Sequence, residues 1–334
     1  MELKNKKVLV TGATGLIGSN LVDTLMREGS ISIVVMGRNQ TKIENTFAEY
    51  LCNDHFKVIE HDVAKPFPES LGHIDVIFHA AGPMERDIVL NKPMDVVLPN
   101  IIGSINCMEY ARKVEVETGN KVRVVMFSSV TVYNNNIGAD LSVTEDMTNC
   151  ADSLDSPTIS YSESKRMTEV IARAYCKQYG VDVVIARFST VYGNTRNIPN
   201  TAFYEFIHKA WNNEEIKINV VGLPRRDNIY VDDAINGLIL VAEKGAIGEA
   251  YNISCGGDKG NFASVDEIAQ TIADVVAELR GTVQMKVIVG NGEPINIRRP
   301  GLILNNSKLK KLGWDIEKDL YQGIKETIKS INSK

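Results

Sequence analysis

The stretch Thr11-Gly12-Ala13-Thr14-Gly15-Leu16-Ile17-Gly18 decides the fold of this chain. It follows a short β-branched run at residues 7–10 and leads into a segment whose apolar residues keep helical spacing up to Gly29. A glycine turn between a strand and a helix lets backbone amides and the positive helix end meet a pyrophosphate without a side chain in the way. The spacing is G-x-x-G-x-x-G rather than the commoner G-x-G-x-x-G, and a tight turn that binds nothing is the alternative. The place of the turn directly after the first strand favours dinucleotide binding.

Short apolar runs alternate with helical stretches over the first half of the chain. The runs lie at residues 7–10, 31–36, 56–59, 74–78, 122–127 and 181–186. Nearly continuous apolar strands that alternate with helices indicate a parallel sheet covered on both faces. We therefore predict an α/β protein in which residues 1–187 form a Rossmann-type, doubly wound parallel sheet that binds a dinucleotide.

The alternation weakens beyond Arg187, and a different organisation is expected there. Helices are predicted at residues 203–211, 232–243, 265–279 and 316–331, and short strands at residues 216–221 and 250–253. We expect residues 188–334 to form a smaller, mixed α/β substrate-binding lobe, interleaved with the first domain, with elements from about residues 225–255 returning to the main sheet. Two polar, turn-rich segments, 134–160 and 290–300, are predicted to be irregular, and the first is long enough for a functional lid or a flexible connector.

Composition narrows the class of protein. The chain has 334 residues, 44% of them apolar and 24% charged, which is enough for one large core or two adjoining ones. The formal net charge of −5 and the pI near 5.7 leave no basic surface, so neither nucleic acid nor an anionic membrane is an expected partner. No apolar run approaches the ~20 residues of a membrane span, and the first residues lead into a strand rather than a signal sequence. A cytoplasmic protein is therefore expected.

The cysteines and histidines give no sign of a metal site or a disulfide framework. The five cysteines are odd in number and scattered without short paired spacings, and the histidines are equally dispersed. We predict no metal and reduced, mostly structural cysteines. These are Cys52, Cys107, Cys150, Cys176 and Cys255.

The end of the second predicted strand should discriminate between NAD and NADP. An acidic residue about 20 positions past the glycine turn would bind the adenosine ribose hydroxyls, but the sequence there reads Val35-Met36-Gly37-Arg38-Asn39. Arg38 is suited to pair with a 2′-phosphate, so these residues lean slightly toward NADP. The alternative is NAD, with Arg38 a solvated surface residue and Asn39 in contact with the ribose.

Further positions complete the expected cofactor site. Asp62-Val63 follows the third strand, where it is expected to meet the adenine, and small residues after the fourth strand let the backbone pass close to the cofactor. Asn100, in a helical run, is a candidate too, although capping a local backbone break or no role at all is equally open. With these, the expected cofactor-binding residues are Gly12, Thr14, Gly15, Leu16, Ile17, Gly18, Arg38, Asn39, Asp62, Val63, Ala80, Ala81, Gly82 and Asn100.

The segment Tyr161-Ser162-Glu163-Ser164-Lys165 predicts proton-transfer chemistry. On a helix, residues four apart share a face, so Lys165 is able to hold its ammonium beside the Tyr161 phenol. A free phenol has a pKa near ~10, whereas a neighbouring cation favours the phenolate, and an oxidised nicotinamide would add a second positive charge. The pair is therefore expected to be a proton shuttle with a lowered phenol pKa beside a hydride acceptor.

Taken together, these motifs closely resemble those of the extended short-chain dehydrogenase/reductase family, in its nucleotide-sugar epimerase and dehydratase branch. The resemblance covers nearly the whole chain, and the ordered set is far more specific than any single motif. Besides the glycine turn and the segment from Tyr161 to Lys165, the matching residues are His79-Ala80-Ala81, Asn100, Phe127-Ser128-Ser129, Val132-Tyr133, Arg187, Val191-Tyr192-Gly193, Arg226-Asp227, Val231-Asp232-Asp233, Arg299-Pro300 and Leu312-Gly313-Trp314.

The resemblance implies roles for individual residues. Ser129 stands where the family has its catalytic serine or threonine, Tyr161 where it has the base, and Lys165 where it has the residue that tunes the base and binds the nicotinamide ribose. An ordinary strand-terminal hydroxyl is the alternative at Ser129. Arg226 and Arg299 would hold the diphosphate of a nucleoside-diphosphate sugar, a role that suits arginine geometry. Simple ion pairs with nearby carboxylates are the alternative for both arginines.

The residues after Ser129 separate the reactions known in this branch. The 4,6-dehydratases place Asp-Glu directly after the catalytic threonine and the uronate decarboxylases keep a glutamate at the position of Thr131, whereas this chain has Val130 and Thr131. Both reactions are therefore disfavoured, and the pattern looks most like that of the 4-epimerases. Thr190 replaces an asparagine that often hydrogen-bonds the substrate phosphates. Thr131 and Thr190 are both expected to line the substrate pocket.

Other outcomes stay open. If Arg38 selects NADP, reduction of a keto sugar or a net dehydrogenation becomes more plausible than epimerisation, because an epimerase returns the same hydride. A non-catalytic NAD(P)-sensing protein is a hypothesis of a different class, and the intact Ser129, Tyr161 and Lys165 argue against it. The helical runs at residues 94–112 and 162–178 resemble the pair that forms a four-helix dimer interface in the family, so a homodimer is expected.

Overall fold

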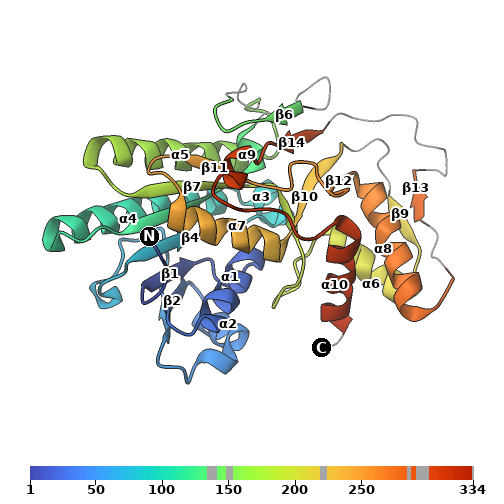
Figure 1. The fold of residues 1–334 in the computed structure, drawn as a ribbon, viewed down its shortest axis with the longest axis horizontal. Coiled ribbons are helices and arrows are strands. Elements are labelled where there is room, and N and C mark those ends of the chain that lie inside the picture. The colour runs from blue at the N-terminus through green and yellow to red at the C-terminus, as the bar shows by residue number, and fades with distance from the viewer. Residues whose placement is uncertain (134–140, 148–152, 219–223, 284–286, 291–300, 333–334) are drawn as a thin grey trace.

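The computed structural model describes residues 1–133, 141–147, 153–218, 224–283, 287–290 and 301–332 (Figure 1). At its centre is a sheet of seven parallel strands in the order β3-β2-β1-β4-β5-β7-β11. The strands are β1 (Lys7–Thr11), β2 (Ser32–Gly37), β3 (Phe56–Glu60), β4 (Val76–His79), β5 (Arg123–Ser129), β7 (Val183–Phe188) and β11 (Ala250–Ile253). The strand order reverses between β1 and β4, as it does in doubly wound dinucleotide-binding sheets. The predicted Rossmann-type sheet is confirmed.

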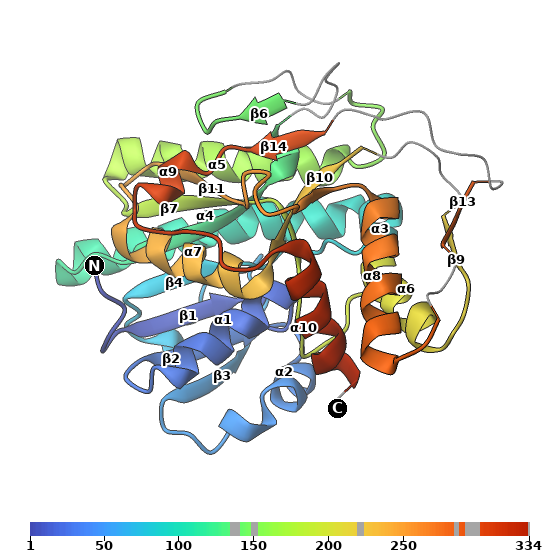
Figure 2. The ribbon, with the colours of Figure 1, turned by 45° about the vertical axis from the view of Figure 1, so that its right-hand side comes forward.

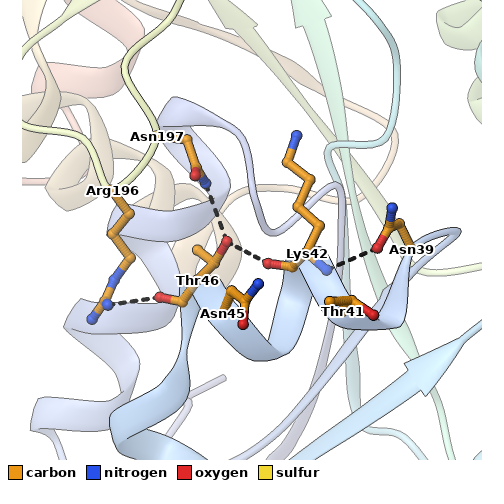
Figure 3. A pocket seen from close by; sticks show the side chains of 7 residues that line it. All are labelled: Asn39, Thr41, Lys42, Asn45, Thr46, Arg196 and Asn197. Carbon is orange, nitrogen blue, oxygen red and sulfur yellow. Dashed lines mark hydrogen bonds between the residues drawn. The ribbon is translucent and has the colours of Figure 1, made fainter.

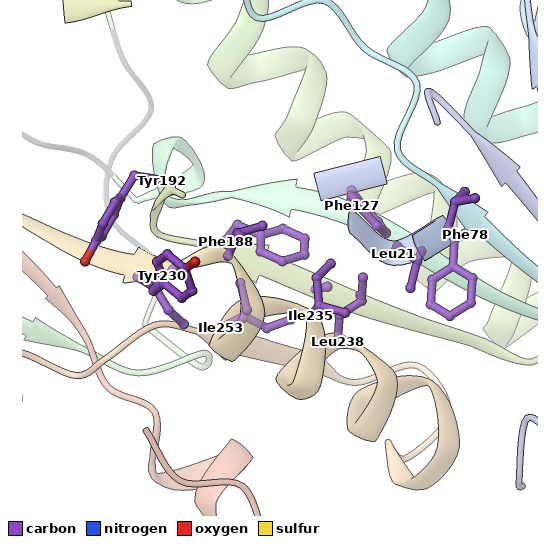
Figure 4. Packing of buried hydrophobic residues seen from close by; sticks show 14 of the residues in the cluster. Leu21, Phe78, Phe127, Phe188, Tyr192, Tyr230, Ile235, Leu238 and Ile253 are labelled. Atoms are coloured by element: carbon purple, nitrogen blue, oxygen red, sulfur yellow. The ribbon is translucent and has the colours of Figure 1, made fainter. Parts of the chain in front are cut away.

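Helices cover both faces of this sheet. α1 and α7 lie together on one face, and α4 and α5 lie together on the other (Figures 1 and 2). Val8 and Val10 of β1 share a buried cluster with Leu21 of α1, whereas Leu9 between them belongs to the cluster of Met108 on α4. Figure 4 shows part of the first cluster, including Leu21 and Phe78. Because successive strand side chains point to opposite faces, both faces demand apolar residues, and the strands read as continuous apolar runs. The helices are α1 (Leu16–Arg27), α2 (Gln40–Thr46), α3 (Arg86–Asn91), α4 (Pro93–Thr118), α5 (Ile159–Tyr179), α6 (Ala202–Trp211), α7 (Val231–Lys244), α8 (Val265–Arg280), α9 (Ser307–Lys310) and α10 (Leu320–Asn332).

Local sequence fixes where three of the longer helices end. α4, α5 and α8 stop at Gly119, Gly180 and Gly281, whose φ angles of 72°, 72° and 61° lie in the left-handed region that favours glycine. At the start of α8, Ser264 and Glu267 form a capping box that satisfies two backbone amides. These signals explain why the helix predicted at residues 265–279 matches α8 to within one residue.

A second, smaller sheet accompanies the main one (Figure 2). Its strands run in the order β12-β10-β14-β6, and β8 pairs with β10 as well. Among the strands that the structure describes in this sheet, only the β10–β12 pair is antiparallel. With α6, α8 and α10, these strands form the predicted smaller mixed α/β lobe. The strands are β6 (Leu141–Val143), β8 (Thr190–Tyr192), β10 (Arg226–Tyr230), β12 (Phe262–Ala263) and β14 (Leu302–Leu304), and a separate parallel pair is formed by β9 (Ile216–Ile218) and β13 (Val287–Val289).

Two local predictions are wrong. The helix predicted at residues 316–331 begins only at Leu320, because the Asp233 carboxylate binds the amides of Glu317 and Lys318, and the Asp319 carboxylate accepts the amide of Gln322. The predicted loop at residues 134–160 contains β6, which pairs with β14, far along the chain. The strand predicted at residues 216–221 is described only to residue 218, and most of the segment 290–300 lies outside the described residues. The division between residues 1–187 and 188–334 stays a prediction.

Two properties of the described residues bear on membranes and metals. In that part of the chain, no helix has the length and apolar character needed to cross a membrane. Among the same residues, no group of three or more His, Cys, Asp or Glu side chains is placed to hold a metal ion. Cys52, Cys107, Cys176 and Cys255 are free thiols, and Cys150 lies outside the described residues.

Candidate active site

The glycine turn adopts a backbone that demands glycine. Gly12 has a φ of +67°, and a Cβ built on it would lie 2.7 Å from the Ala80 carbonyl group and the Ala81 amide nitrogen. A Cβ on Gly18 would lie 2.5 Å from the Gly12 oxygen. Gly15 is the N-cap of α1, so the free amides of the first helical turn begin directly at the glycine turn. This cradle, which side chains would fill, fits the pyrophosphate of a dinucleotide.

A hollow of about 170 Å³ opens beside the turn. Arg38 and Asn39 are both exposed there, and the Asn39 side chain accepts a 2.8 Å hydrogen bond from the Lys42 amide, which caps α2. The lining contains two cations, Arg38 and Lys42, and no carboxylate. Lys42 was not identified in the sequence, although it lies one helical turn beyond Asn39. The lining residues are Gly12, Ala13, Thr14, Met36, Gly37, Arg38, Asn39, Lys42 and Ile43. Leu16 and Ile17, at the start of α1, instead pack against the core.

A larger polar hollow, of about 610 Å³, lies between α2 and the segment after β8. Figure 3 shows the side chains that line it. The Asn197 amide donates to the Thr14 carbonyl oxygen at 3.1 Å and to the Thr46 hydroxyl at 3.2 Å. Arg196 pairs with Asp23 at 2.6 Å and donates to the Thr46 carbonyl oxygen at 2.8 Å. This segment therefore braces the glycine turn and α2. No local pattern identifies it in the sequence, because Asn197 and Thr14 are 183 positions apart.

The pair predicted to meet the adenine follows β3. The Asp62 carboxylate accepts the Ala64 amide at 3.0 Å, so it stabilises a local turn. Val63 is buried, and its carbonyl oxygen accepts a 2.8 Å hydrogen bond from the Asn106 side chain on α4. The structure thus fixes this turn against α4, and contact with an adenine stays a prediction.

The segment after β4 passes close to the helices that carry the other site residues. A Cβ on Gly82 would collide with the Asn100 side-chain oxygen and lie 3.4 Å from Lys165 Nζ. Asn100 is 1% exposed, and its amide donates to the Ser164 hydroxyl at 2.8 Å. Its Oδ1 atom has no hydrogen-bond partner within the described residues. An orphaned buried acceptor beside a buried ammonium and bare backbone fits a polar group of a bound ligand.

His79 joins the ends of β1 and β4. Its Nδ1 atom lies 2.9 Å from the Thr11 hydroxyl, which also accepts the Ala81 amide at 3.3 Å. Burial, together with the charge of Lys165, lowers the pKa of His79 to about 3. The imidazole is therefore neutral at physiological pH and holds the two strand ends in register.

Ser129, Tyr161 and Lys165 come together where β5 ends and α5 begins. Their side chains are buried, with exposed fractions of 8%, 9% and 6%. The Ser129 hydroxyl lies near enough to the Tyr161 phenol to lower its pKa, and Lys165 Nζ donates to the Phe127 carbonyl oxygen at 2.9 Å. The three residues assigned to catalysis by resemblance are thus neighbours, drawn from two elements that are adjacent in space.

The expected lowering of the Tyr161 pKa is wrong for this arrangement. Burial raises the pKa of Tyr161 above the ordinary value of 10.0, and the hydrogen bond with Ser129 offsets this only in part. The Lys165 ammonium is bonded to the Phe127 carbonyl oxygen, and burial lowers the pKa of Lys165 to about 8. Desolvation of the phenol therefore decides the direction of its pKa shift.

The predicted substrate-binding residues are spread over the smaller sheet and the end of β5. The Thr131 amide donates to the Ser129 hydroxyl at 3.2 Å, and the buried Thr131 hydroxyl has no partner within the described residues. Thr190, half-buried, begins β8. Arg226, exposed, begins β10, and within the described part of the chain its guanidinium makes no ion pair. Arg299 lies outside the described residues.

Comparison with known proteins agrees with this geometry. A sequence model of the NAD dependent epimerase/dehydratase family matches residues 8–254. UDP-glucuronic acid decarboxylase 6 of Arabidopsis thaliana is 28% identical over 96% of this chain and 87% of its own length. dTDP-D-glucose 4,6-dehydratase of Homo sapiens is 26% identical over 97% of this chain and 89% of its own. UDP-glucuronic acid 4-epimerase from Bacillus cereus, solved with UDP-glucuronic acid and NAD, superposes with a TM-score of 0.77 and 25% identity over 98% of this chain and 99% of its own.

The family match includes the glycine turn, the residues gathered around Tyr161, and the edge strand β11. It covers well over half of the chain, and the similar proteins align with it almost from end to end. The chain therefore belongs to the NAD dependent epimerase/dehydratase family of the extended short-chain dehydrogenases/reductases and is an enzyme of that type.

Proposed function

We propose that this enzyme is a nucleotide-sugar 4-epimerase, which acts on C4 of the sugar of a nucleoside-diphosphate sugar. The observation that carries the proposal is the convergence of the Ser129 and Tyr161 hydroxyls beside Lys165, with no carboxylate in the two positions after Ser129. Val130 and Thr131 fill those positions. An epimerase needs a base, a polar partner and space in which the keto sugar can rotate. Residues 130–132, directly after Ser129, supply no further acid or base.

The residues of the chain divide the chemistry between them. Bound NAD would supply the hydride acceptor at C4 and, when oxidised, a positive charge that favours the phenolate. Tyr161 takes the proton of the 4-hydroxyl group and later returns it to the keto oxygen. Ser129, whose hydroxyl lies near the phenol, orients the sugar oxygen toward it. Lys165, whose pKa is about 8, stays largely protonated at pH 7 and stabilises the phenolate.

Some of the similar proteins are decarboxylases and dehydratases, so the residues of the site are needed to choose between the possible reactions. A dehydratase or decarboxylase that uses a carboxylate as acid or base would need that carboxylate beside Ser129. Thr131 offers only a hydroxyl there, which does not exchange protons readily at neutral pH. The second candidate is a keto-sugar reductase or dehydrogenase. Arg38 and Lys42 favour it, because a hollow with two cations and no carboxylate also suits NADP.

Arg226 is proposed to bind the diphosphate of the substrate. Within the described residues Arg226 makes no ion pair, whereas the adjacent Arg225 pairs with Glu267 at 2.7 Å. A guanidinium that no carboxylate holds is available for the bidentate contact that phosphate oxygens accept. Arg299 is proposed as a second contact on resemblance alone.

A homodimer is proposed through α4 and α5. The two helices lie side by side on one face of the main sheet (Figure 2), and Met94, Leu98, Met167 and Val170 on them are 56%, 44%, 44% and 53% exposed. Apolar side chains gathered on one surface are typical of an interface. Sedimentation should give a dimer for the wild type and a monomer for Val170→Glu, and a wild-type monomer at micromolar concentration would exclude this assembly.

The test of the proposed function is incubation with UDP-, dTDP-, GDP- and CDP-sugars, with products resolved by chromatography and NMR. We expect interconversion of C4 epimers without net accumulation of reduced cofactor or release of carbon dioxide from a uronate. Stoichiometric consumption of NADPH would support the reductase instead. Mass spectrometry of nucleotide released on denaturation identifies NAD or NADP. No product from any sugar nucleotide would favour a non-catalytic NAD(P)-sensing protein.

A further inference from the structure

A buried polar network lies beneath the turn that follows Ser129. Its centre is an ion pair in which Arg187 Nη2 lies 2.7 Å from Glu169 Oε2 and Arg187 Nε lies 2.9 Å from Glu169 Oε1. Both side chains are 9% exposed. A buried ion pair is costly unless its remaining donors and acceptors are satisfied, so its other partners show what it holds in place. Neither residue has a part in the proposed chemistry.

Two further side chains, one on each side of the turn, bond with this ion pair, and Arg187 Nη1 also donates to the Glu145 carbonyl oxygen at 3.0 Å. Ser128 Oγ donates to Glu169 Oε1 at 2.5 Å. The Tyr133 hydroxyl accepts from Arg187 Nη1 at 2.6 Å and donates to Asn252 Oδ1 at 2.8 Å. The Arg187 guanidinium also lies 5.0 Å from the centre of the Tyr133 ring. The Tyr133 side chain is 1% exposed, so both hydrogen bonds are shielded from water.

The turn between these two anchors carries the Ser129 hydroxyl. Ser129 caps the 3₁₀ turn η3 (Val130–Val132) by accepting the Thr131 amide at 3.2 Å. The Tyr133 amide donates to the Val130 carbonyl oxygen at 3.0 Å and closes the turn at its other end. Because the turn is so short, a shift of Tyr133 is transmitted to the Ser129 hydroxyl. Ser128 limits movement only on the strand side.

Helix α5 contacts the end of β5 through side chains that are one helical turn apart. Tyr161, Lys165 and Glu169 follow one another at intervals of one helical turn on α5 and meet three consecutive residues at the end of β5. Lys165 and Glu169 do so through hydrogen bonds, and Tyr161 through its proximity to the Ser129 hydroxyl. The strand end is thus registered against α5 at three points. Beyond β5, Arg166 of α5 donates to the Val132 carbonyl oxygen at 3.4 Å, and Arg187 and Asn252 hold the Tyr133 hydroxyl from the main sheet.

We propose that Tyr133 is a positioning residue, whose hydroxyl, held between Arg187 and Asn252, sets the Ser129 hydroxyl at the phenol of Tyr161. This inference rests on the proposed roles of Ser129 and Tyr161 in catalysis. Asn252 belongs to β11 and Arg187 to β7, so two strands of the main sheet fix the group that orients the serine. Tyr133 does not touch the reacting atoms and acts through Ser129.

The test compares Tyr133→Phe, which keeps the ring and removes both hydrogen bonds, with Tyr204→Phe as a matched control. Tyr204 is 6% exposed and donates to the Gly193 carbonyl oxygen at 2.8 Å, so its variant also loses a buried hydroxyl bond. With ¹³Cζ-labelled tyrosine, the Tyr161 signal, identified by its loss in Tyr161→Phe, reports the hydrogen bond with Ser129. We expect Tyr133→Phe to move this signal toward its value in Ser129→Ala, and Tyr204→Phe to leave it unchanged.

Turnover supplies the second readout. We expect Tyr133→Phe to lower kcat about tenfold with KM within about twofold of the wild type, while Tyr204→Phe keeps both. A wild-type Tyr161 signal in Tyr133→Phe, or an unchanged kcat, overturns the inference even if the melting temperature falls. If no nucleotide sugar is turned over by the wild type, the proposed function fails, and the NMR comparison alone still decides whether Tyr133 positions Ser129.

Discussion

The ammonium of Lys165 lies 2.9 Å from the carbonyl oxygen of Phe127, two residues before Ser129 on β5. This contact places a cation at the end of the strand, in a position where it is 6% exposed. Burial lowers the pKa of Lys165 from 10.5 to about 8, so the fold disfavours the charged form that the chemistry uses. A group retained at the expense of stability is a common mark of a functional site.

Lys165→Met removes the charge and keeps the length of the side chain. We expect kcat to fall at least about 100-fold, while the free energy of unfolding at pH 7 stays equal or rises because the desolvation penalty disappears. The folded pKa lies below the unfolded one, so wild-type stability increases between pH 8 and 10.5, and the advantage of the variant should shrink over that window. Denaturant unfolding at several pH values measures both. A variant less stable at pH 7 by more than about 2 kcal/mol would contradict this.

Gly12→Ala and Gly15→Ala separate the fold of the turn from its ligand. The Gly12 variant forces a Cβ to within 2.7 Å of Ala80 at a φ of +67°, so we expect a loss of more than about 2 kcal/mol of stability as well as cofactor affinity. At Gly15 a Cβ meets only the Gly12 oxygen, at 3.4 Å, so the melting temperature should hold while the affinity for NAD falls. Calorimetric titration with NAD measures the affinity. Unchanged NAD binding by Gly15→Ala would argue against a pyrophosphate at this turn.

The buried carboxyl group of Asp227 should make the stability of the protein depend on pH. It is 3% exposed, and burial raises its pKa from 3.8 to about 6. The folded state therefore binds the proton more tightly, and the stability that protonation contributes is fully present below pH 3.8 and lost as the pH rises through 6. Asp227→Asn should gain stability relative to the wild type as the pH rises from 4 to 7, by up to about 3 kcal/mol. A difference that stays constant with pH would show that Asp227 is not the titrating group.

The main sheet was predictable because all of its strands except the edge strand β3 are buried on both faces, which leaves nearly unbroken apolar runs in the sequence. The glycine turn and the Tyr161 to Lys165 pair were predictable because their geometry is set by spacing along one turn or one helix. The smaller sheet was not, since β6 and β14 are three residues long and find each other only in the folded chain, with Ser142 opposite Ile303.

Two features of the site needed the structure. Arg196 contacts Thr46, 150 positions earlier in the sequence, and Asn197 contacts Thr14, 183 positions earlier. No local sequence pattern encodes contacts over such separations. The direction of the Tyr161 pKa depended on how deeply the phenol is buried and on which acceptor holds the Lys165 ammonium. Helical spacing places two residues on one face, but it does not determine their solvation.

The central claim is that the Tyr161 hydroxyl transfers the proton of the sugar, and replacing Tyr161 by Phe tests it most directly. Calorimetry would first confirm that the variant binds NAD as the wild type does. The rate at which a nucleotide sugar reduces the bound cofactor would then be followed by absorbance in a single turnover. We predict a fall of at least about 1,000-fold in that rate with unchanged NAD affinity. A rate within about twofold of the wild type would contradict the account.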